Sequence, residues 1–151
     1  MHVVLVEPEI PPNTGSIARL CAATATPLHL VGRLGFSLDD KHLRRAGLDY
    51  WPHVEVHRHE SWDDFARAVS GRRFGFSARA ERVYTEARYA AGDVLIFGGE
   101  TRGLPAPVKA ELGGDALYRI PIVTTHVRSL NLANAVSIVL YEALRQIGWR
   151  A

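Results

Sequence analysis

The sequence predicts an α/β fold in which helices cover both faces of a mostly parallel sheet. Short apolar segments alternate with segments of helical periodicity along the chain. Short apolar strands of this kind are typical of a sheet buried under helices on both sides. No linker, internal repeat or low-complexity tract interrupts the 151 residues, so we expect one domain spanning residues 1–151.

Apolar runs and punctuating residues place the individual elements. The run at 2–6 predicts a strand, because it is too short and lacks the basic start of a signal peptide. Prolines stiffen the approach to an expected helix at 15–25. Ser61 and Asp64 have the spacing of an N-cap pair for a helix at 61–69, and Gly148 is a natural stop for a helix at 129–147. Further strands are expected at 28–31, 53–57, 73–77, 94–97 and 117–121, and further helices at 40–46 and 105–112.

The composition is that of an ordinary soluble globular protein, with 47% apolar and 23% charged residues. No apolar run reaches 18 residues, so no transmembrane span is expected. The single cysteine, Cys21, has no partner for an internal disulfide, which fits a reducing cytoplasm. Its apolar neighbours indicate a buried, unreactive thiol.

The net charge of +2 is too small to indicate nucleic-acid binding by itself. Basic residues nevertheless cluster locally, and acidic residues lie between them, so solvated faces and a nucleic-acid-binding surface are both open interpretations. The two clusters are Lys41, Arg44 and Arg45, and Arg72, Arg73, Arg79 and Arg82.

The last helix is expected to be apolar on two sides. One stripe consists of Val136, Leu140, Ala143, Leu144 and Ile147, and a second begins with Ile138 and Tyr141. A helix of this kind is either buried in its own chain or shared with a partner. A terminal helix of a small domain is seldom surrounded by its own chain, so we expect a homodimer packed through it.

Three loops at transitions from strand to helix predict one composite ligand site. The clearest follows Ile120-Pro121-Ile122-Val123, where Ser129, Asn131 and Asn134 stand near the start of the last helix. Free backbone N–H groups and the helix dipole converge at such a position. The other two loops are Pro11-Pro12-Asn13-Thr14-Gly15 and Phe97-Gly98-Gly99-Glu100-Thr101-Arg102-Gly103-Leu104-Pro105.

Taken singly, these two loops leave alternatives open. Gly98, Gly99 and Gly103 allow the backbone to approach a ligand closely, but a tight turn without function has the same spacing. The loop is neither a Walker loop nor a dinucleotide fingerprint. Arg19, one turn into its helix, is placed to hold a phosphate, although a surface arginine behind an Asn13 cap fits equally well.

Two other kinds of site are not supported. His57 and His59 alternate along an expected strand without a set of carboxylates or cysteines, so we expect no metal. Ser129 has no evident His/Asp relay, which argues against a hydrolase triad.

Taken together, the three motifs resemble those of the SPOUT superfamily, and within it the SpoU class of RNA 2′-O-ribose methyltransferases. The resemblance spans almost the whole chain. The matching residues are Asn13-x-Gly15-x-x-x-Arg19, the segment 97–105, and Ile120-Pro121-Ile122 followed by residues 128–135.

Segments 7–15, 19–22 and 39–50 resemble more narrowly the tRNA (cytidine/uridine-34)-2′-O-methyltransferases. The resemblance implies methylation, dependent on S-adenosylmethionine, of the ribose at the wobble nucleotide of tRNA. The implied partner is the anticodon stem-loop and the implied compartment is the cytoplasm. The alternatives are a ribosomal-RNA methyltransferase of the same class, a non-catalytic dimer that binds RNA or cofactor, and a flavodoxin-type nucleotide-binding module.

The resemblance also implies a deep trefoil knot in the C-terminal half and a homodimer whose site uses both chains. Arg19 would reach the site of the other subunit, where we expect it to orient the ribose and its phosphate, because arginine stays protonated. The dimer contact would include Tyr141. The implied cofactor contacts are Ser77, Gly98, Ile120, Ser129, Leu130 and Leu132, the catalytic pocket is Arg19, Asn13, Glu100, Ser129 and Asn131, and the RNA surface is Lys41, Arg44, Arg45 and Arg79.

Overall fold

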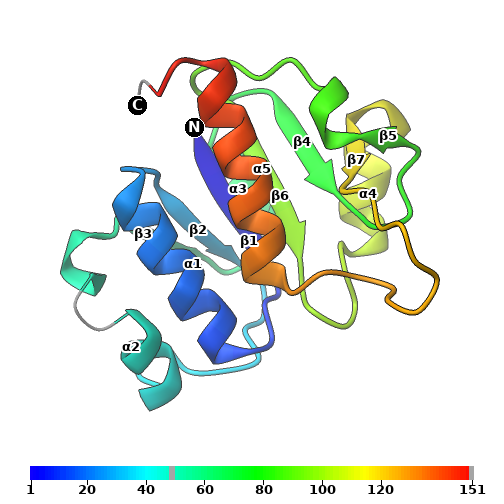
Figure 1. Ribbon diagram of the computed structural model, residues 1–151. Helices are drawn as coiled ribbons and strands as arrows, with labels where there is room; N and C mark the ends of the chain where they lie inside the picture. Colours follow the sequence, from blue (N-terminus) through cyan, green and yellow to red (C-terminus); the bar gives the residue numbers. More distant parts are fainter. Residues whose placement is uncertain (48–49, 150–151) are drawn as a thin grey trace.

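The computed structural model describes residues 1–47 and 50–149. Seven parallel strands form one sheet in the order β3-β2-β1-β6-β4-β7-β5 (Figure 1). This confirms the predicted α/β class and the parallel sheet. The strands are β1 (His2–Val6), β2 (Leu28–Val31), β3 (Val56–His59), β4 (Arg73–Phe76), β5 (Arg82–Val83), β6 (Val94–Gly98) and β7 (Leu117–Arg119). The helices are α1 (Pro11–Ala23), α2 (Lys41–Gly47), α3 (Trp62–Ala68), α4 (Ala106–Leu112) and α5 (Leu132–Gln146), with 3₁₀ turns η1 (Trp51–His53), η2 (Tyr84–Glu86) and η3 (Gly114–Ala116).

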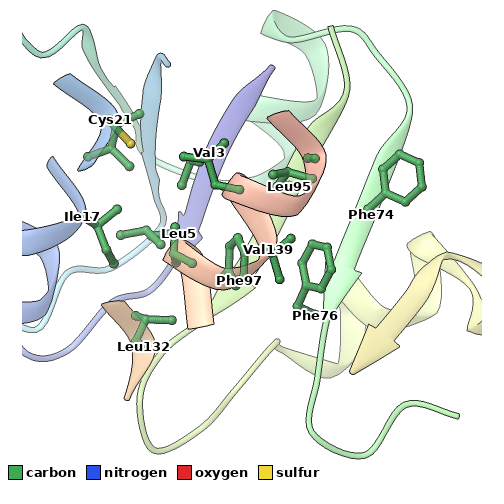
Figure 2. Close-up of a cluster of buried hydrophobic side chains, with 14 of the residues drawn as sticks. Val3, Leu5, Ile17, Cys21, Phe74, Phe76, Leu95, Phe97, Leu132 and Val139 are labelled. Carbon is green, nitrogen blue, oxygen red and sulfur yellow. The ribbon is translucent and has the colours of Figure 1, made fainter. Parts of the chain in front are cut away.

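Helices cover both faces of the sheet, as the apolar strands predict. Alternate residues of β1 point to opposite sides, so Val3 belongs to one core cluster and Val4 to the other. Helices α1 and α5 pack together over the first cluster, where Val139 lies with Phe97 (Figure 2). Helices α3 and α4 cover the second cluster through Phe65 and Val108. No helix in the described part of the chain is long and apolar enough to cross a membrane.

The last helix begins three residues later than the expected start at 129. Asn131 has an extended backbone, with φ −51° and ψ 135°, and its side chain accepts a hydrogen bond from the backbone N–H of Asn134 at 3.2 Å. An asparagine in this position is a strong N-cap and fixes the helix start at Leu132. Ser129 and Leu130 therefore belong to the preceding loop.

The boundaries of other helices and strands differ from the predicted ones for local reasons. Helix α1 begins at Pro11 instead of residue 15, because proline fits the first turn of a helix, where its missing N–H has no role. The expected strand 53–57 shifts to Val56–His59, because η1 occupies residues 51–53. The two-residue β5 was not predicted, since so short a strand leaves no periodic signal. Ser61 caps α3 as predicted, accepting from the N–H of Asp64 at 3.1 Å, and Gly148 follows α5 with a φ of +74°.

The last helix is apolar on two sides, as predicted. Its inner stripe is buried from Val136 to Leu144 and half-buried at Ile147, whereas Ile138 and Tyr141 are 36% and 44% exposed. The ring of Trp149 contacts Tyr141 edge-on, with 5.4 Å between the ring centroids, and Trp149 is itself exposed. The outer apolar face of α5 therefore has no cover from the described part of this chain.

Cys21 lies in the core beside α5, as expected for an unreactive thiol. It is buried within the first cluster, and burial raises the pKa of its thiol to about 12. The thiol is therefore protonated at neutral pH and a poor nucleophile.

Candidate active site

Three of the predicted cofactor contacts lie at one edge of the sheet. Strands β6, β4 and β7 are neighbours and run in parallel, so their carboxyl ends meet at the same edge. Gly98 ends β6, Ser77 follows β4, and Ile120 follows β7. The backbone N–H of Ser77 donates to the carbonyl of Tyr118 at 2.9 Å, which continues the pairing of β4 with β7 into the loops. The site that the three motifs predict is thus assembled by strand order, at the edge where α/β proteins bind ligands.

Gly98 is packed directly against the end of its own loop. A Cβ atom at Gly98 would lie 2.0 Å from the carbonyl carbon of Gly103 and 2.2 Å from the backbone nitrogen of Leu104. The backbone N–H of Gly103 also donates to the carbonyl of Gly99 at 2.9 Å, and Gly103 has a φ of +66°. The loop therefore folds back tightly on β6, which only glycine at position 98 allows.

The long loop between β7 and α5, which begins at Ile120, exposes apolar side chains. Val123 is fully exposed, Val127 is 48% exposed and Leu130 is 36% exposed. Leu132 differs from Leu130, because it belongs to the core cluster with 9% exposure. Exposed apolar side chains on a loop at this edge of the sheet are suited to a flat aromatic base such as adenine.

A chain of hydrogen bonds joins the three motifs. The side-chain amide of Asn131 donates to Oδ1 of Asn13 at 3.0 Å, and Nδ2 of Asn13 donates to Oε1 of Glu100 at 3.3 Å. The Glu100 carboxylate also accepts from the backbone N–H groups of Glu9 and Ile10, at 2.7 and 3.1 Å. The structure thus brings Asn13, Glu100 and Asn131 together, as the three motifs predict.

Arg19 and Ser129 stay outside this network. Arg19 is exposed on α1, and its guanidinium lies over the ring of Tyr50, 4.7 Å from the centroid. Ser129 is exposed in the loop before α5, and its side chain has no hydrogen bond within residues 1–47 and 50–149. The roles of both residues stay predictions.

The predicted RNA-binding residues divide between two places. Lys41, Arg44 and Arg45 lie on α2, which packs against α1, whereas Arg79 lies in the loop after β4 (Figure 1). The backbone N–H of Arg79 donates to Oγ of Ser77 at 3.4 Å, so this arginine borders the predicted cofactor contacts. Arg44 pairs with Asp39 at 3.0 Å. Lys41 and Arg45 have no acidic partner in the described part of the chain.

One residue of this site, Glu9, was missing from the predicted catalytic and cofactor residues. Its carboxylate accepts from Thr101 and Arg102 on the β6 loop. The hydrogen bond from the Thr101 hydroxyl, together with the backbone N–H groups, holds the pKa of this carboxyl below its ordinary value. An acidic residue three positions after the first strand, in a proline-bounded turn, is the signal from which sequence reasoning could have found it.

The opposite edge of the sheet has a depression of about 440 Å³ lined by His2, Arg72 and Asp93 among others. Arg72 and Asp93 neutralise one another there in an ion pair of 2.8 Å. None of the three motifs lines this depression. Within the described residues, no group of histidine, cysteine and carboxylate side chains has the geometry of a metal site.

Comparison with known proteins places this arrangement among RNA methyltransferases. The model of the SpoU rRNA Methylase family matches residues 1–141. The tRNA (cytidine(34)-2′-O)-methyltransferase of Escherichia coli strain K12 is 48% identical over 150 residues, which cover 99% of this chain and 95% of that protein. The protein of the same name from Methylovorus glucosotrophus strain SIP3-4 is 47% identical over 145 residues, 95% of this chain and 94% of that one.

Solved structures have the same fold over nearly the full chain. One concerned with the 2-OH methylation of C/U34 on tRNA has a TM-score of 0.92 and 50% identity, covering 99% of this chain and 97% of that chain. The SpoU methyltransferase AviRb from Streptomyces viridochromogenes, in complex with AdoMet, has a TM-score of 0.84 and 25% identity. That match covers 97% of this chain and 60% of AviRb.

Proposed function

Because the chain belongs to the SpoU rRNA methylase family, we propose that it methylates the ribose 2′-hydroxyl of the wobble nucleotide of tRNA, with S-adenosylmethionine as the donor. The wobble nucleotide, at position 34, is a cytidine or uridine. The observation that carries this proposal is the 48% identity, over 99% of this chain, to the E. coli tRNA (cytidine(34)-2′-O)-methyltransferase. Residues 1–151 would act as one methyltransferase domain, in the cytoplasm.

The carboxyl edge of β4, β6 and β7 fits an S-adenosylmethionine site. Gly98 lets the loop pack closely against the end of β6 there, and Leu130 adds an exposed apolar surface suited to adenine. In our proposal the backbone at Ser77, Gly98 and Ile120 holds the cofactor, with Ser129, Leu130 and Leu132 beside it. The bound cofactor supplies a methyl group on a sulfonium, which is electrophilic without help from a metal.

The reaction is a single in-line displacement. The ribose O2′ would take the methyl group that S-adenosylmethionine supplies, and the hydroxyl proton would pass toward the phosphate of the nucleotide. The protein's contribution is to hold the two reactants in line, and positioning of this kind supplies roughly 7–11 kcal/mol. The hydrogen-bonded Asn131, Asn13 and Glu100 support the pocket in which this alignment is set.

Arg19 is proposed to act on the ribose and phosphate at the site of a second subunit. Its side chain is exposed and lies against Tyr50 instead of the cofactor loops of its own chain. Arginine remains protonated, so Arg19 would orient the nucleotide and would not act as a base. The phosphate of the nucleotide would help to accept the proton of the 2′-hydroxyl. The uncovered apolar face of α5, with Ile138 and Tyr141, supports a homodimer that brings Arg19 across.

The tRNA would be held mainly through phosphate contacts, with the anticodon loop splayed over the site. Arg79 borders the predicted cofactor contacts, and Lys41 and Arg45 carry charge that no described acidic side chain neutralises.

We include in the proposal a trefoil knot in the C-terminal half. The insertion of β4 between β6 and β7 in the sheet supports such a crossing.

Nucleoside mass spectrometry tests the function directly. Unmodified tRNA is incubated with the purified protein and S-adenosylmethionine, digested and mapped. We expect 2′-O-methylcytidine or 2′-O-methyluridine at position 34. Methyl transfer to ribosomal RNA but not to tRNA would replace the proposed substrate, and cofactor binding without transfer to either RNA would indicate a binding protein.

A further inference from the structure

Two loops of the candidate active site cross at very close range. A Cβ atom at Gly99 would lie 2.6 Å from the carbonyl oxygen of Glu7 and 2.7 Å from Oε1 of Glu9. Glu7 begins the turn out of β1 with a φ of +53°, in the left-handed region that non-glycine residues rarely adopt. Strained backbone of this kind persists only where the surrounding structure fixes it. The turn after β1 is thus held firmly against the loop after β6.

Two glutamates bind the loops to each other reciprocally. The Glu100 carboxylate, from the β6 loop, accepts from the backbone N–H groups of Glu9 and Ile10, at 2.7 and 3.1 Å. The Glu9 carboxylate, from the β1 turn, accepts from the N–H of Thr101 at 3.2 Å, from its hydroxyl at 2.6 Å, and from the N–H of Arg102 at 3.4 Å. We call these residues, Glu9 with Thr101 and Arg102, the Glu9 clasp.

The Glu9 clasp supplies acceptors to the backbone N–H groups of Thr101 and Arg102. Residues 99–103 form a turn closed by the hydrogen bond from the N–H of Gly103 to the carbonyl of Gly99. Glu9 gives the N–H groups of Thr101 and Arg102 a charged acceptor, and hydrogen bonds to ionised groups are about twice as strong as neutral ones. The same hydrogen bonds lower the pKa of Glu9, and its carboxylate is ionised at neutral pH. The loop conformation next to Gly98 therefore depends on Glu9.

We propose that Glu9 is a positioning residue, whose carboxylate fixes the loop 99–103 in the shape that receives S-adenosylmethionine beside Gly98. This rests on the proposed function, because it assigns the cofactor to this loop. Glu9 acts through the backbone of Thr101 and Arg102 and does not itself touch the reacting atoms. Its loss lowers affinity for S-adenosylmethionine by loosening the loop, while the core of the sheet stays intact.

Three variants separate positioning from overall stability. Glu9→Ala removes all three hydrogen bonds, and Glu9→Gln keeps one acceptor oxygen. Thr101→Val removes the hydroxyl donor and keeps the backbone donors. Glu60→Ala is the matched control, because Glu60 is an exposed glutamate after another strand with no side-chain hydrogen bond in the described part of the chain.

Amide hydrogen exchange on the ligand-free protein and calorimetric titration with S-adenosylmethionine are the first two measurements. In Glu9→Ala we expect the amides of Thr101 and Arg102 to exchange roughly tenfold faster or more, and the dissociation constant to rise by about tenfold. Amides of Val4 and Leu95, in the buried strands, should keep the protection seen in Glu60→Ala. Glu9→Gln and Thr101→Val should fall between Glu9→Ala and the unaltered protein.

Steady-state kinetics with tRNA supply the third measurement. We expect KM for S-adenosylmethionine to rise in Glu9→Ala while KM for tRNA stays near that of the control. Unchanged exchange at Thr101 and Arg102, or a rise confined to KM for tRNA, would overturn the proposal. If Glu9→Ala does not fold, Glu9→Gln and Thr101→Val decide it by the same readouts. If the unaltered protein binds the cofactor without methylating tRNA, the proposed function fails, and exchange and calorimetry still decide the role of Glu9.

Discussion

Asn131 and Asn13 are 118 residues apart in the chain, yet the side-chain amide of Asn131 donates to Oδ1 of Asn13 at 3.0 Å. The direction of this hydrogen bond is fixed, because Oδ1 of Asn131 already caps α5 and Nδ2 of Asn13 already donates to Glu100. One bond therefore couples the start of the last helix to the turn after the first strand.

Replacing Asn131 separates its two roles. In Asn131→Asp the cap survives, because a carboxylate oxygen accepts equally well from Asn134, but the donor to Asn13 is lost. In Asn131→Ala both are lost, at a cost of about 1 kcal/mol in stability. We expect unfolding experiments to show Asn131→Asp close to the unaltered protein, whereas methyl transfer falls in both variants. Full activity in Asn131→Asp would show that the link to Asn13 is dispensable.

Exchanging Arg19 tests its proposed role on the nucleotide. We expect Arg19→Ala to lower kcat by roughly 100-fold, the size of effect that misplacement of a reactant produces. Calorimetric affinity for S-adenosylmethionine should change little, since Arg19 lies against Tyr50 and not against the cofactor loops of its own chain. Arg19→Lys is the control, because it keeps the charge without the planar fork. Equal losses of binding and turnover would contradict an orienting role.

An alanine at Gly98 should damage the cofactor loop itself. The added Cβ would lie 2.0 Å from the backbone of Gly103, so the loop must move, at a cost of about 1–3 kcal/mol. We expect calorimetry to detect no S-adenosylmethionine binding by Gly98→Ala.

Gly113→Ala is the matched control for that variant. Gly113 follows α4 with a φ of +79° and has no atom within 4 Å of an added Cβ. Its ψ of 156° places it in a region that is essentially restricted to glycine, so alanine there should cost about 1–3 kcal/mol in backbone strain while the cofactor still binds. Loss of binding in both variants would mean that general destabilisation, not the approach at Gly98, is responsible.

The buried His29 predicts a stability that falls in acid. His29 is 3% exposed, and its two ring nitrogens lie 3.0 Å from ring nitrogens of His2 and His59. Burial, reinforced by the neighbouring histidines, lowers its pKa from 6.5 to about 3. Between these values the unfolded chain binds a proton that the folded protein does not, so stability is lost as pH falls, by up to about 1.4 kcal/mol per pH unit.

Urea unfolding across this pH range checks the prediction. We expect His29→Gln, which keeps a donor and an acceptor without a titrating ring, to flatten the pH dependence below 6.5. His53→Gln serves as the control, because His53 is exposed in η1. A pH dependence unchanged in His29→Gln would assign the acid sensitivity to other groups.

Salt dependence tests the RNA-binding surface. The logarithm of the tRNA binding constant should fall linearly with the logarithm of salt concentration. We expect Lys41→Ala and Arg45→Ala each to reduce the slope by about 0.7, the value for one lost phosphate contact. Lys109→Ala on α4 is the control, because α4 lies on the opposite face of the sheet from α1, against which α2 packs. If the slopes are identical in all variants, the tRNA binds to another surface of the protein.

Much of the fold followed from local sequence. Apolar runs placed β1, β2 and β6 within a residue of their observed bounds, because buried parallel strands are apolar on both faces. The buried stripe of α5 followed from helical spacing. Local sequence signals did not predict the boundary of a helix or strand where a single side chain or turn sets that boundary. The cap at Asn131 delays α5 to Leu132, and η1 displaces β3.

By itself the sequence determined the alternation of elements, the three motifs and the family to which they point. Only the tertiary structure decided that β4 lies between β6 and β7, which brings Ser77, Gly98 and Ile120 to one edge. It alone paired Glu9 with Thr101, 92 residues away. The physical reason is the distance along the chain over which each interaction acts. Helix and strand preferences act over a few neighbouring residues, whereas hydrogen bonds between distant loops form only when the packed sheet has set the order of its strands.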